Sequence, residues 1–334
     1  MTTTIAIVGC AHIHIGGFVE TINSRPDIRC KSVWDPDPAR AEKQAAALGA
    51  EVALGYETIY ADPEIEAVLV CTETNLHEQM VLPGAAAHKH LFVEKPLGMG
   101  AADAYRMAAA IDAAGVLYGT GFFMRGFPAH IFLKEQIERG AFGHITRIRG
   151  SNCHSGALGR WFDTEWRWMA DPQVAGVGAF GDLGAHMLDI LLWFLGDVSA
   201  VTAQLDPGTG AYAGCDETGE ALLRFSNGVI GTLAAAWDDV ANPVSFLISG
   251  TEGHAAIISG DLYFKSARVE GANGKTPWTD LPPDRPASLD AFLDAVTGKE
   301  AALVSVGEAA YRSAVMEAIY EGARRDAWVN PVLP

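Results

Sequence analysis

The chain has 334 residues, of which 49% are hydrophobic and 19% charged, and its formal net charge at pH 7 is −17. A chain of this length is longer than a single hydrophobic core usually supports, so two domains are expected. Its composition excludes a disordered protein. The excess of negative charge argues against a nucleic-acid partner, because binding of phosphates needs a basic face.

The first 123 residues alternate between apolar strands and helices. Strands are predicted at residues 4–9, 28–35, 67–72, 90–96 and 116–123, and helices at residues 13–24, 37–49, 77–88 and 101–115. In the second helix Asp37 is the expected N-cap, Pro38 the first helical residue and Gly49 the stop. Strands without polar alternation are typical of a parallel sheet covered on both faces. This pattern predicts an α/β Rossmann dinucleotide-binding domain over residues 1–123.

The pattern changes after residue 123. A helix at 129–143 leads into a strand from residue 145, and a helix follows at 180–195. Longer strands with looser alternation then continue to about residue 270, before two terminal helices. We expect an α+β substrate-binding domain over residues 124–334, built on a largely antiparallel open sheet with one face on helices. The open face suggests a homodimer or homotetramer formed through this sheet.

The sequence gives no sign of membrane insertion or export. Its longest strongly apolar run, Ile190 to Leu195, is far shorter than a membrane span. The N-terminal MTTTIAIVGC lacks the basic region of a signal peptide and is typical of a strand. We therefore expect a cytoplasmic protein without a membrane partner.

Metal binding is not expected either. The five cysteines are scattered without a CxxC pair, which predicts reduced thiols. The HIH and HKH sequences at residues 12–14 and 88–90 are interpreted as a helix start and a turn before a strand.

The turn VGCAHIH follows the first predicted strand, where a dinucleotide-binding turn belongs. In the usual G-x-G-x-x-G pattern, Gly9 supplies the first glycine, while Ala11 and His14 occupy the other two places. Amides at a helix start attract the pyrophosphate, and Ala11 adds only one methyl group to its approach. We therefore place Gly9, Ala11, His12 and Ile13 beside the cofactor; a helix-surface position is the alternative for His12.

Polar residues at the ends of the second and third strands extend this site. Asp35 is placed where a carboxylate binds the adenine ribose hydroxyls and would repel a 2′-phosphate, which favours NAD over NADP. Arg40 could contradict this, although a solvated helix charge is its alternative role. Thr72, Asn75 and His77 are expected to face the cofactor crevice, and a helix N-terminal position without chemistry is the alternative for His77.

The segment GDLGAHMLDILLWFLG carries ionisable residues in an apolar setting. If it is helical, Asp182, His186, Asp189 and Trp193 are spaced by four, three and four residues and share one stripe. The leucines opposite would face the core. A partly exposed stripe with a buried histidine satisfied by Asp182 is the alternative, but three ionisable residues on such a helix favour an active site.

Three features together resemble a known family: the nucleotide turn at Gly9, the EKPL sequence at 94–97, and GDLGAHMLD at 181–189. Over essentially its whole length the chain resembles the glucose-fructose oxidoreductase / inositol dehydrogenase / rhizopine catabolism (Gfo/Idh/MocA) family. The resemblance implies a Rossmann domain, a mixed-sheet C-terminal domain, a nicotinamide cofactor and a sugar or cyclitol substrate. It also implies a catalytic role for Lys95, with a Lys–Pro bond that is often cis.

The resulting assignment of catalytic residues is Lys95, Asp182 and His186. Oxidation of an alcohol needs a base for the hydroxyl proton, and His186 suits this task. Lys95 can stabilise the same oxygen, and Asp182 can orient the substrate or tune both groups. Which of Lys95 and His186 takes the proton first stays open. Glu94 is placed beside the cofactor in a structural role.

Further contacts are expected on three other stretches. EWRWM and GFFMRGF match recurrent family positions near the cofactor, with a packing aromatic or a surface ion pair as the alternative. The cofactor contacts implied there are Trp166, Arg167 and Arg125. The segment 153–163, rich in glycine and polar groups, is predicted to be a substrate-facing loop. The substrate contacts expected, besides the catalytic residues, are His154, Arg160, Trp161 and Asp189.

These observations lead to one main hypothesis and two alternatives. The main hypothesis is an NAD-dependent dehydrogenase that oxidises a secondary hydroxyl of a sugar, cyclitol or related polyol. One alternative is an NADPH-dependent keto-sugar reductase. The other is a sugar sensor on the same fold that binds a nucleotide and catalyses nothing, although a sensor does not need a lysine, an aspartate and a histidine together at its cleft.

Overall fold

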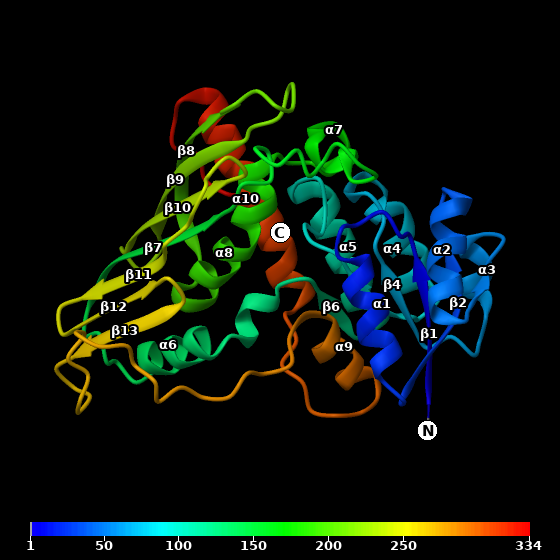
Figure 1. The fold of residues 1–334 in the computed structure, drawn as a ribbon, viewed down its shortest axis with the longest axis horizontal. Helices are drawn as coiled ribbons and strands as arrows, with labels where there is room; N and C mark the ends of the chain where they lie inside the picture. Colours follow the sequence, from blue (N-terminus) through cyan, green and yellow to red (C-terminus); the bar gives the residue numbers. More distant parts are fainter. Residues whose placement is uncertain (1) are drawn as a thin grey trace.

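The structure, a computed structural model, describes residues 2–334. Two β-sheets lie toward opposite ends of the molecule, with α8 and α10 between them (Figure 1). Over residues 2–334 the first sheet has six strands, all parallel, in the order β3-β2-β1-β4-β5-β6. Its strands are β1 (Thr3–Val8), β2 (Ile28–Trp34), β3 (Glu51–Val52), β4 (Ala67–Val70), β5 (His90–Val93) and β6 (Tyr118–Thr120). This is the predicted Rossmann arrangement.

The strand order creates a crevice at the end of β1. β1 pairs with β2 on one side and with β4 on the other, so the connections diverge there. Ligands of doubly wound sheets bind at such a point, beyond the carboxyl ends of the strands. The residues that follow β1, β2 and β4 therefore converge on one crevice.

The helices of this domain agree with the predicted alternation. They are α1 (Ile15–Ser24), α2 (Pro38–Leu48), α3 (Tyr56–Ala61), α4 (His77–Ala86) and α5 (Ala101–Ala114), with the 3-10 turn η1 (Thr74–Leu76). α2 begins as predicted, because the Asp37 side chain accepts from the Ala39 amide at 2.9 Å, and it ends at Gly49 with a φ of 61°. β3 and α3 were not predicted; β3 has only two residues, both exposed, and so no apolar pattern.

The second sheet, in the same described range, has seven strands in the order β13-β12-β11-β7-β10-β9-β8. They are β7 (Ile145–Cys153), β8 (Val198–Asp206), β9 (Thr218–Phe225), β10 (Ile230–Ala236), β11 (Val244–Gly250), β12 (Gly253–Ile258) and β13 (Asp261–Ser266). The sheet is mostly antiparallel, as predicted, but β7 and β10 pair in parallel at its centre. Local alternation could not show this pairing, because it joins residues far apart in the chain, from Ile230 with Arg147 to Ala236 with Cys153.

Helices cover one face of the second sheet. They are α6 (Pro128–Glu138), α8 (Ala179–Leu195) and α10 (Val306–Arg325). The short helix η2 (Phe123–Gly126) precedes α6, and η3 (Arg167–Ala170) and α7 (Pro172–Ala175) precede α8. α9 (Ser288–Val296) instead returns to the Rossmann sheet, where Phe292 packs on Phe92 with ring centroids 5.8 Å apart. The predicted boundary between residues 123 and 124 therefore separates the sheets but not the helices, and it stays a prediction.

One segment has the length and composition of a membrane span. Residues Pro172–Leu195 meet both criteria, but 89% of the apolar window is buried inside the protein. A core helix passes the same test, so this segment is weak evidence for membrane insertion.

The first turn of α8 is held by partners from other elements. The Tyr320 hydroxyl accepts from the amides of Gly178 and Gly181 at 2.9 and 3.1 Å. The Asp216 carboxylate accepts from the Phe180 amide at 2.8 Å and from the Tyr320 hydroxyl at 2.9 Å. These bonds satisfy helix amides that have no partner within the helix, and they fix where α8 begins.

A buried ion-pair network holds the middle of α8. The Asp189 carboxylate accepts from Arg125 at 2.5 and 2.8 Å and from Arg312 at 2.9 Å, and its side chain is 1% exposed. Glu308 also pairs with Arg125 at 2.9 Å. The network joins η2, α8 and α10 one turn beyond His186.

Removal of the charge of Asp189 should destabilise the protein strongly, because two arginines would lose their buried partner. We expect Asp189→Asn to lower the free energy of unfolding by about 3 kcal/mol in urea titrations. Glu321→Gln, at an exposed pair with Arg324, is the control and should cost less than about 1 kcal/mol. Equal effects of the two substitutions would contradict a structural role for Asp189.

Candidate active site

The turn after β1 is held tightly between its neighbouring strands. Gly9 has a φ of 85°, and a Cβ there would lie 2.2 to 2.7 Å from Thr72. The amides of Ala11 and His12 donate to the Cys71 carbonyl at 3.0 and 3.1 Å. These close approaches explain why glycine is needed at position 9.

The same contacts change how the turn can bind a phosphate. Two of the amides expected to bind the pyrophosphate are already bonded to Cys71, directly after β4, and the His14 amide donates to His12 Nδ1 at 3.3 Å. Within residues 2–334 the Ile13 amide forms none of these bonds, and it stays the donor of this turn best suited to a phosphate.

Asp35 lies beside this turn, at the end of β2. Its two oxygens accept from the Cys10 amide at 2.5 Å and from the Asp37 amide at 2.7 Å. Arg40 donates to it at 2.8 Å and to Glu73 at 3.0 Å. Burial raises the pKa of Asp35, against the effect of these bonds. The carboxylate is therefore in the predicted place, and it also holds the turn and Arg40.

The residues after β4 leave polar atoms unpaired at the crevice. Thr72 Oγ1, Glu73 Oε2 and His77 Nε2 are buried and have no hydrogen-bond partner among the described residues. His77 Nδ1 bonds the Leu97 carbonyl at 3.1 Å, and burial lowers the pKa of His77. Asn75 is exposed. Unpaired buried polar atoms are costly in a folded protein, and a bound nucleotide would provide partners for them.

The loop after β5 brings Lys95 to the second domain. The Lys95–Pro96 bond is cis, as the family resemblance implied. Lys95 Nζ donates to Asp182 Oδ1 at 2.5 Å, and Trp237 Nε1 donates to the other oxygen of Asp182 at 3.2 Å. Burial would raise the pKa of Asp182, but the charge and hydrogen bond of Lys95 hold this pKa at about 2. Asp182 thus stays ionised and keeps the ammonium group in the cleft.

His186 lies one turn of α8 beyond Asp182. It is 4% exposed and packs against the Phe123 ring, with centroids 4.8 Å apart. Its Nδ1 is buried without a hydrogen-bond partner in the described part of the chain. Burial, and next the charge of Lys95, lower the pKa of His186 well below its usual value. The imidazole is therefore neutral near pH 7 and can accept a proton.

Glu94 is at the centre of a third group of contacts. Its carboxylate is fully buried and accepts from the Lys95 amide and from His14 Nδ1, both at 2.9 Å. His12 Nδ1 lies 3.6 Å away, and the His12 ring is buried rather than on a helix surface. Burial would raise the pKa of Glu94, but the two histidines keep it below its usual range.

The same three side chains have the geometry of a metal site. Ligand atoms of His12, His14 and Glu94 all lie within 4.8 Å of one another, although the sequence predicted no metal. Each group already has a hydrogen-bond partner in this cluster, so its polar atoms are satisfied without an ion. The absence of a metal stays a prediction.

Of the substrate contacts predicted in the segment 153–163, His154 lies near the cluster and Arg160 lies on the surface. His154 is near the cluster: burial lowers its pKa, and the charges of Asp182 and Lys95 also act on it. Its ring lies 4.7 Å from that of Trp161, which is 46% exposed. Arg160 instead pairs with Asp163 at 2.8 Å on the surface.

Trp168, rather than Trp166, forms the hydrogen bond to the nucleotide turn. Trp168 Nε1 donates to the Ala11 carbonyl at 3.1 Å. Both tryptophans are partly exposed and pack on the same hydrophobic cluster, which also contains Ile13 of the turn. Arg167 is exposed, pairs with Asp163 at 3.2 Å and lies over the Tyr212 ring. The EWRWM sequence contains two tryptophans two residues apart. The conformation of the loop decides which of them contacts the nucleotide turn.

Arg125 and Asp189 are not brought to the cluster either. They pair with each other in the buried network of η2, α8 and α10, which explains why charged residues occur in such apolar segments. Sequence reasoning missed Glu73, Phe123, Trp168 and Trp237. A glutamate directly after a buried strand was the available signal for Glu73.

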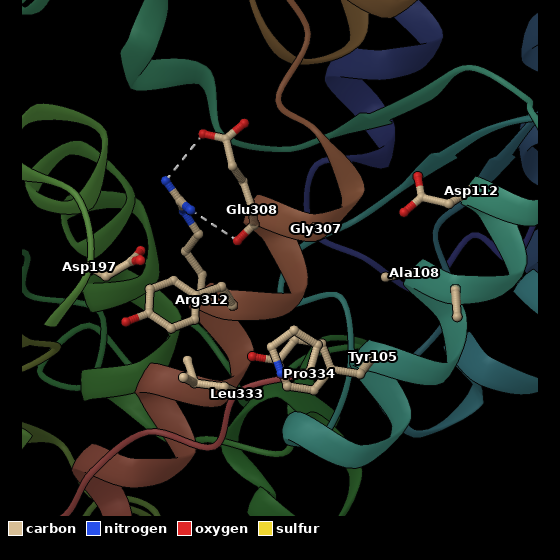
Figure 2. Close-up of a pocket in the computed structure, with 11 residues that line it drawn as sticks. Tyr105, Ala108, Asp112, Asp197, Gly307, Glu308, Arg312, Leu333 and Pro334 are labelled. Atoms are coloured by element: carbon tan, nitrogen blue, oxygen red, sulfur yellow. Dashed lines mark hydrogen bonds and ion pairs between the residues drawn. The ribbon is translucent and has the colours of Figure 1, made fainter. Parts of the chain in front are cut away.

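Cavity size alone does not identify this site. A cavity of about 490 Å³ lies between α5 and α10, where Figure 2 shows Glu308 paired with Arg312 beside Tyr105 and the C-terminal Pro334. None of the residues that line it was predicted to bind cofactor or substrate. We therefore locate the active site by the clustered titratable groups.

Comparison with known proteins agrees with this geometry. Residues 3–122 match the oxidoreductase family with an NAD-binding Rossmann fold, and residues 130–256 match the GFO/IDH/MocA C-terminal domain. The chain belongs to the Gfo/Idh/MocA oxidoreductase family. Its N-terminal domain is thus an NAD-binding domain, which the unpaired polar atoms and the Gly9 turn fit.

The relatives of this chain include proteins named as sugar and inositol dehydrogenases. Levoglucosan dehydrogenase of Pseudarthrobacter phenanthrenivorans is 28% identical over 248 residues, which cover 67% of this chain and 63% of that protein. The scyllo-inositol 2-dehydrogenase (NAD(+)) of Bacillus subtilis is 26% identical over 287 residues, which cover 84% and 79%. The match thus spans less than two thirds of levoglucosan dehydrogenase.

A solved structure shows the same fold over the whole chain. Levoglucosan dehydrogenase in complex with NADH and levoglucosan superimposes with a TM-score of 0.84 at 22% identity, and the match covers 99% of this chain and 100% of that one. At this identity the similarity establishes the arrangement of both domains.

Buried histidines should make the stability of the Gfo/Idh/MocA protein depend on pH. Burial lowers the pKa of His12 to about 3 and also lowers those of His77, His130 and His186. The unfolded chain binds these protons near pH 6.5, so the stability is full above this pH and is lost as the pH falls below it. We expect the urea-derived free energy of unfolding to fall by at least about 2 kcal/mol between about pH 7.5 and about pH 5.

Two variants test the cause of that decrease. His130→Gln removes a buried titrating group and should make the pH dependence shallower, whereas His144→Gln, at an exposed site, should leave it unchanged. A profile that is flat over this range, or that His130→Gln does not alter, would show that buried neutral histidines do not control it.

Proposed function

We propose that the protein is an NAD-dependent dehydrogenase that oxidises a secondary hydroxyl of a sugar, cyclitol or related polyol. The observation that carries this proposal is the cluster of Lys95, Asp182 and His186 beside an NAD-binding crevice. The names of relatives that act on levoglucosan and inositols support the substrate class.

The reaction divides between the cofactor and the protein. Bound NAD⁺ would supply the acceptor for the hydride of the alcohol carbon, and the hydroxyl proton would go to a protein group. Neutral His186 can accept this proton as the C=O bond forms. The ammonium of Lys95 can donate a hydrogen bond to the same oxygen and stabilise its developing negative charge.

Asp182 positions Lys95 in this scheme. Its buried carboxylate accepts a hydrogen bond from Nζ of Lys95 and fixes this atom at 2.5 Å. Phe123 closes one side of His186 and limits the access of water to the imidazole. These two features make the cluster suited to alcohol oxidation with a preset proton acceptor.

The two alternatives have less support. A keto-sugar reductase that uses NADPH would need room for a 2′-phosphate, but Asp35 and Glu73 place two carboxylates at that end of the crevice. A sensor would not need the buried Lys95–Asp182 pair next to a neutral histidine.

We also propose a cytoplasmic location.

We further propose a homodimer or homotetramer formed through the open face of the second sheet. Leu222 and Ile230 are 43% and 60% exposed there, on the neighbouring strands β9 and β10. Such side chains suit an interface between copies of the chain.

Lys95→Met should separate catalysis from cofactor binding. We expect kcat for NAD⁺ reduction with the best substrate of a polyol and sugar panel to fall about a thousandfold, because the oxygen loses its charged donor. The Kd for NADH, measured by fluorescence titration, should change less than about threefold. Lys275→Met, at an exposed site, is the control.

Near-normal turnover by Lys95→Met would rule out the proposed chemistry. A panel in which no polyol is oxidised, together with tight NADH binding by the unmodified protein, would instead favour the sensor.

A further inference from the structure

The adenosine end of the crevice contains a charged triad of Asp35, Arg40 and Glu73, and Glu73 is not part of the usual dinucleotide fingerprint. Asp35 follows β2 and Glu73 follows β4, so the two carboxylates flank the Gly9 turn from opposite sides. Arg40, from the first turn of α2, spans them at 2.8 Å from Asp35 and 3.0 Å from Glu73.

Arg40 would otherwise be suited to bind a 2′-phosphate. A guanidinium near the adenine ribose is the usual means by which a Rossmann site accepts the 2′-phosphate of NADP. In this protein one carboxylate takes Nε of Arg40 and the other takes Nη1, and the side chain is only 23% exposed. The three side chains together carry one net negative charge.

Glu73 has a second oxygen that is still available. Glu73 Oε2 is buried and has no hydrogen-bond partner among residues 2–334, while Oε1 binds Arg40. Such an oxygen can accept a hydrogen bond from a ribose hydroxyl, whereas a phosphate dianion has no proton to donate and would be repelled.

We propose that Glu73 is a cofactor-selectivity residue. It holds Arg40 against Asp35 and adds a second carboxylate at the ribose, so the crevice accepts the free 2′-hydroxyl of NAD and rejects the 2′-phosphate of NADP. Asp35 at the end of β2 is the usual determinant of this choice. Here Glu73, which follows β4 on the other side of β1, prevents Arg40 from binding a 2′-phosphate and so from reversing the preference for NAD.

The test is the binding of cofactor to Glu73→Gln, which removes the charge and keeps the shape. Dissociation constants for NADH and NADPH come from fluorescence titration, and those for 5′-AMP and adenosine 2′,5′-bisphosphate from calorimetry. We expect Glu73→Gln to lower the dissociation constants of NADPH and of the bisphosphate about tenfold, relative to those of NADH and 5′-AMP, which lack the 2′-phosphate. Binding of NADH should change less than about threefold.

Two further variants show whether Arg40 is the cause. Arg40→Met added to Glu73→Gln should abolish the gain in NADPH affinity, because the phosphate would lose its donor. Glu78→Gln is the matched control, since Glu78 pairs with Arg106 on the surface at 2.5 Å and should leave both affinities unchanged.

Several outcomes would overturn the proposal. They are a ratio of NADPH to NADH affinity that changes less than twofold in Glu73→Gln, the same gain in Glu78→Gln, and a gain that persists without Arg40. If Glu73→Gln does not fold, Glu73→Asp keeps the charge but shortens the side chain, and its NADPH affinity should rise by a smaller factor. An unchanged ratio in that variant would count against the proposal.

Discussion

The ion pair between Lys95 and Asp182 is the interaction on which the rest of the site depends. Lys95 follows β5 of the Rossmann domain and Asp182 lies in the first turn of α8 in the second domain, so the pair joins the domains at the cleft. Both side chains are largely removed from water, at 3% and 13% exposure. Loss of either partner would leave an uncompensated charge there, so burial enforces the pairing.

This pair also determines the state of its neighbours. Burial of His186 against the rings of Phe122 and Phe123, and next the charge of Lys95, lower the pKa of the imidazole, so the histidine stays neutral. A neutral acceptor next to a charged donor is the combination that alcohol oxidation requires. Desolvation therefore produces the neutral state of His186, while the ion pair with Asp182 holds the donor Lys95 in place.

α8 acts as a rigid support for these groups. Its first turn is capped by Tyr320 and Asp216, and its middle is held by Asp189 between two arginines. Its apolar sides pack in the core, which explains the high hydropathy of the segment. Since the helix is fixed at both places, the position of His186 relative to Lys95 is set by structure outside the cleft.

Much of this protein could be predicted from its sequence. Five of the six strands of the Rossmann sheet, the capped helix at Asp37 and the spacing of Asp182 and His186 follow from short local patterns. The tertiary structure alone decided the parallel pairing of β7 with β10, the return of α9 to the first domain, and the hydrogen bond of Trp168 to Ala11. It also paired Asp189 with Arg125 and placed Glu73 on Arg40. Each of these contacts joins residues more than thirty positions apart, and which distant charges and rings meet depends on packing that no local pattern contains.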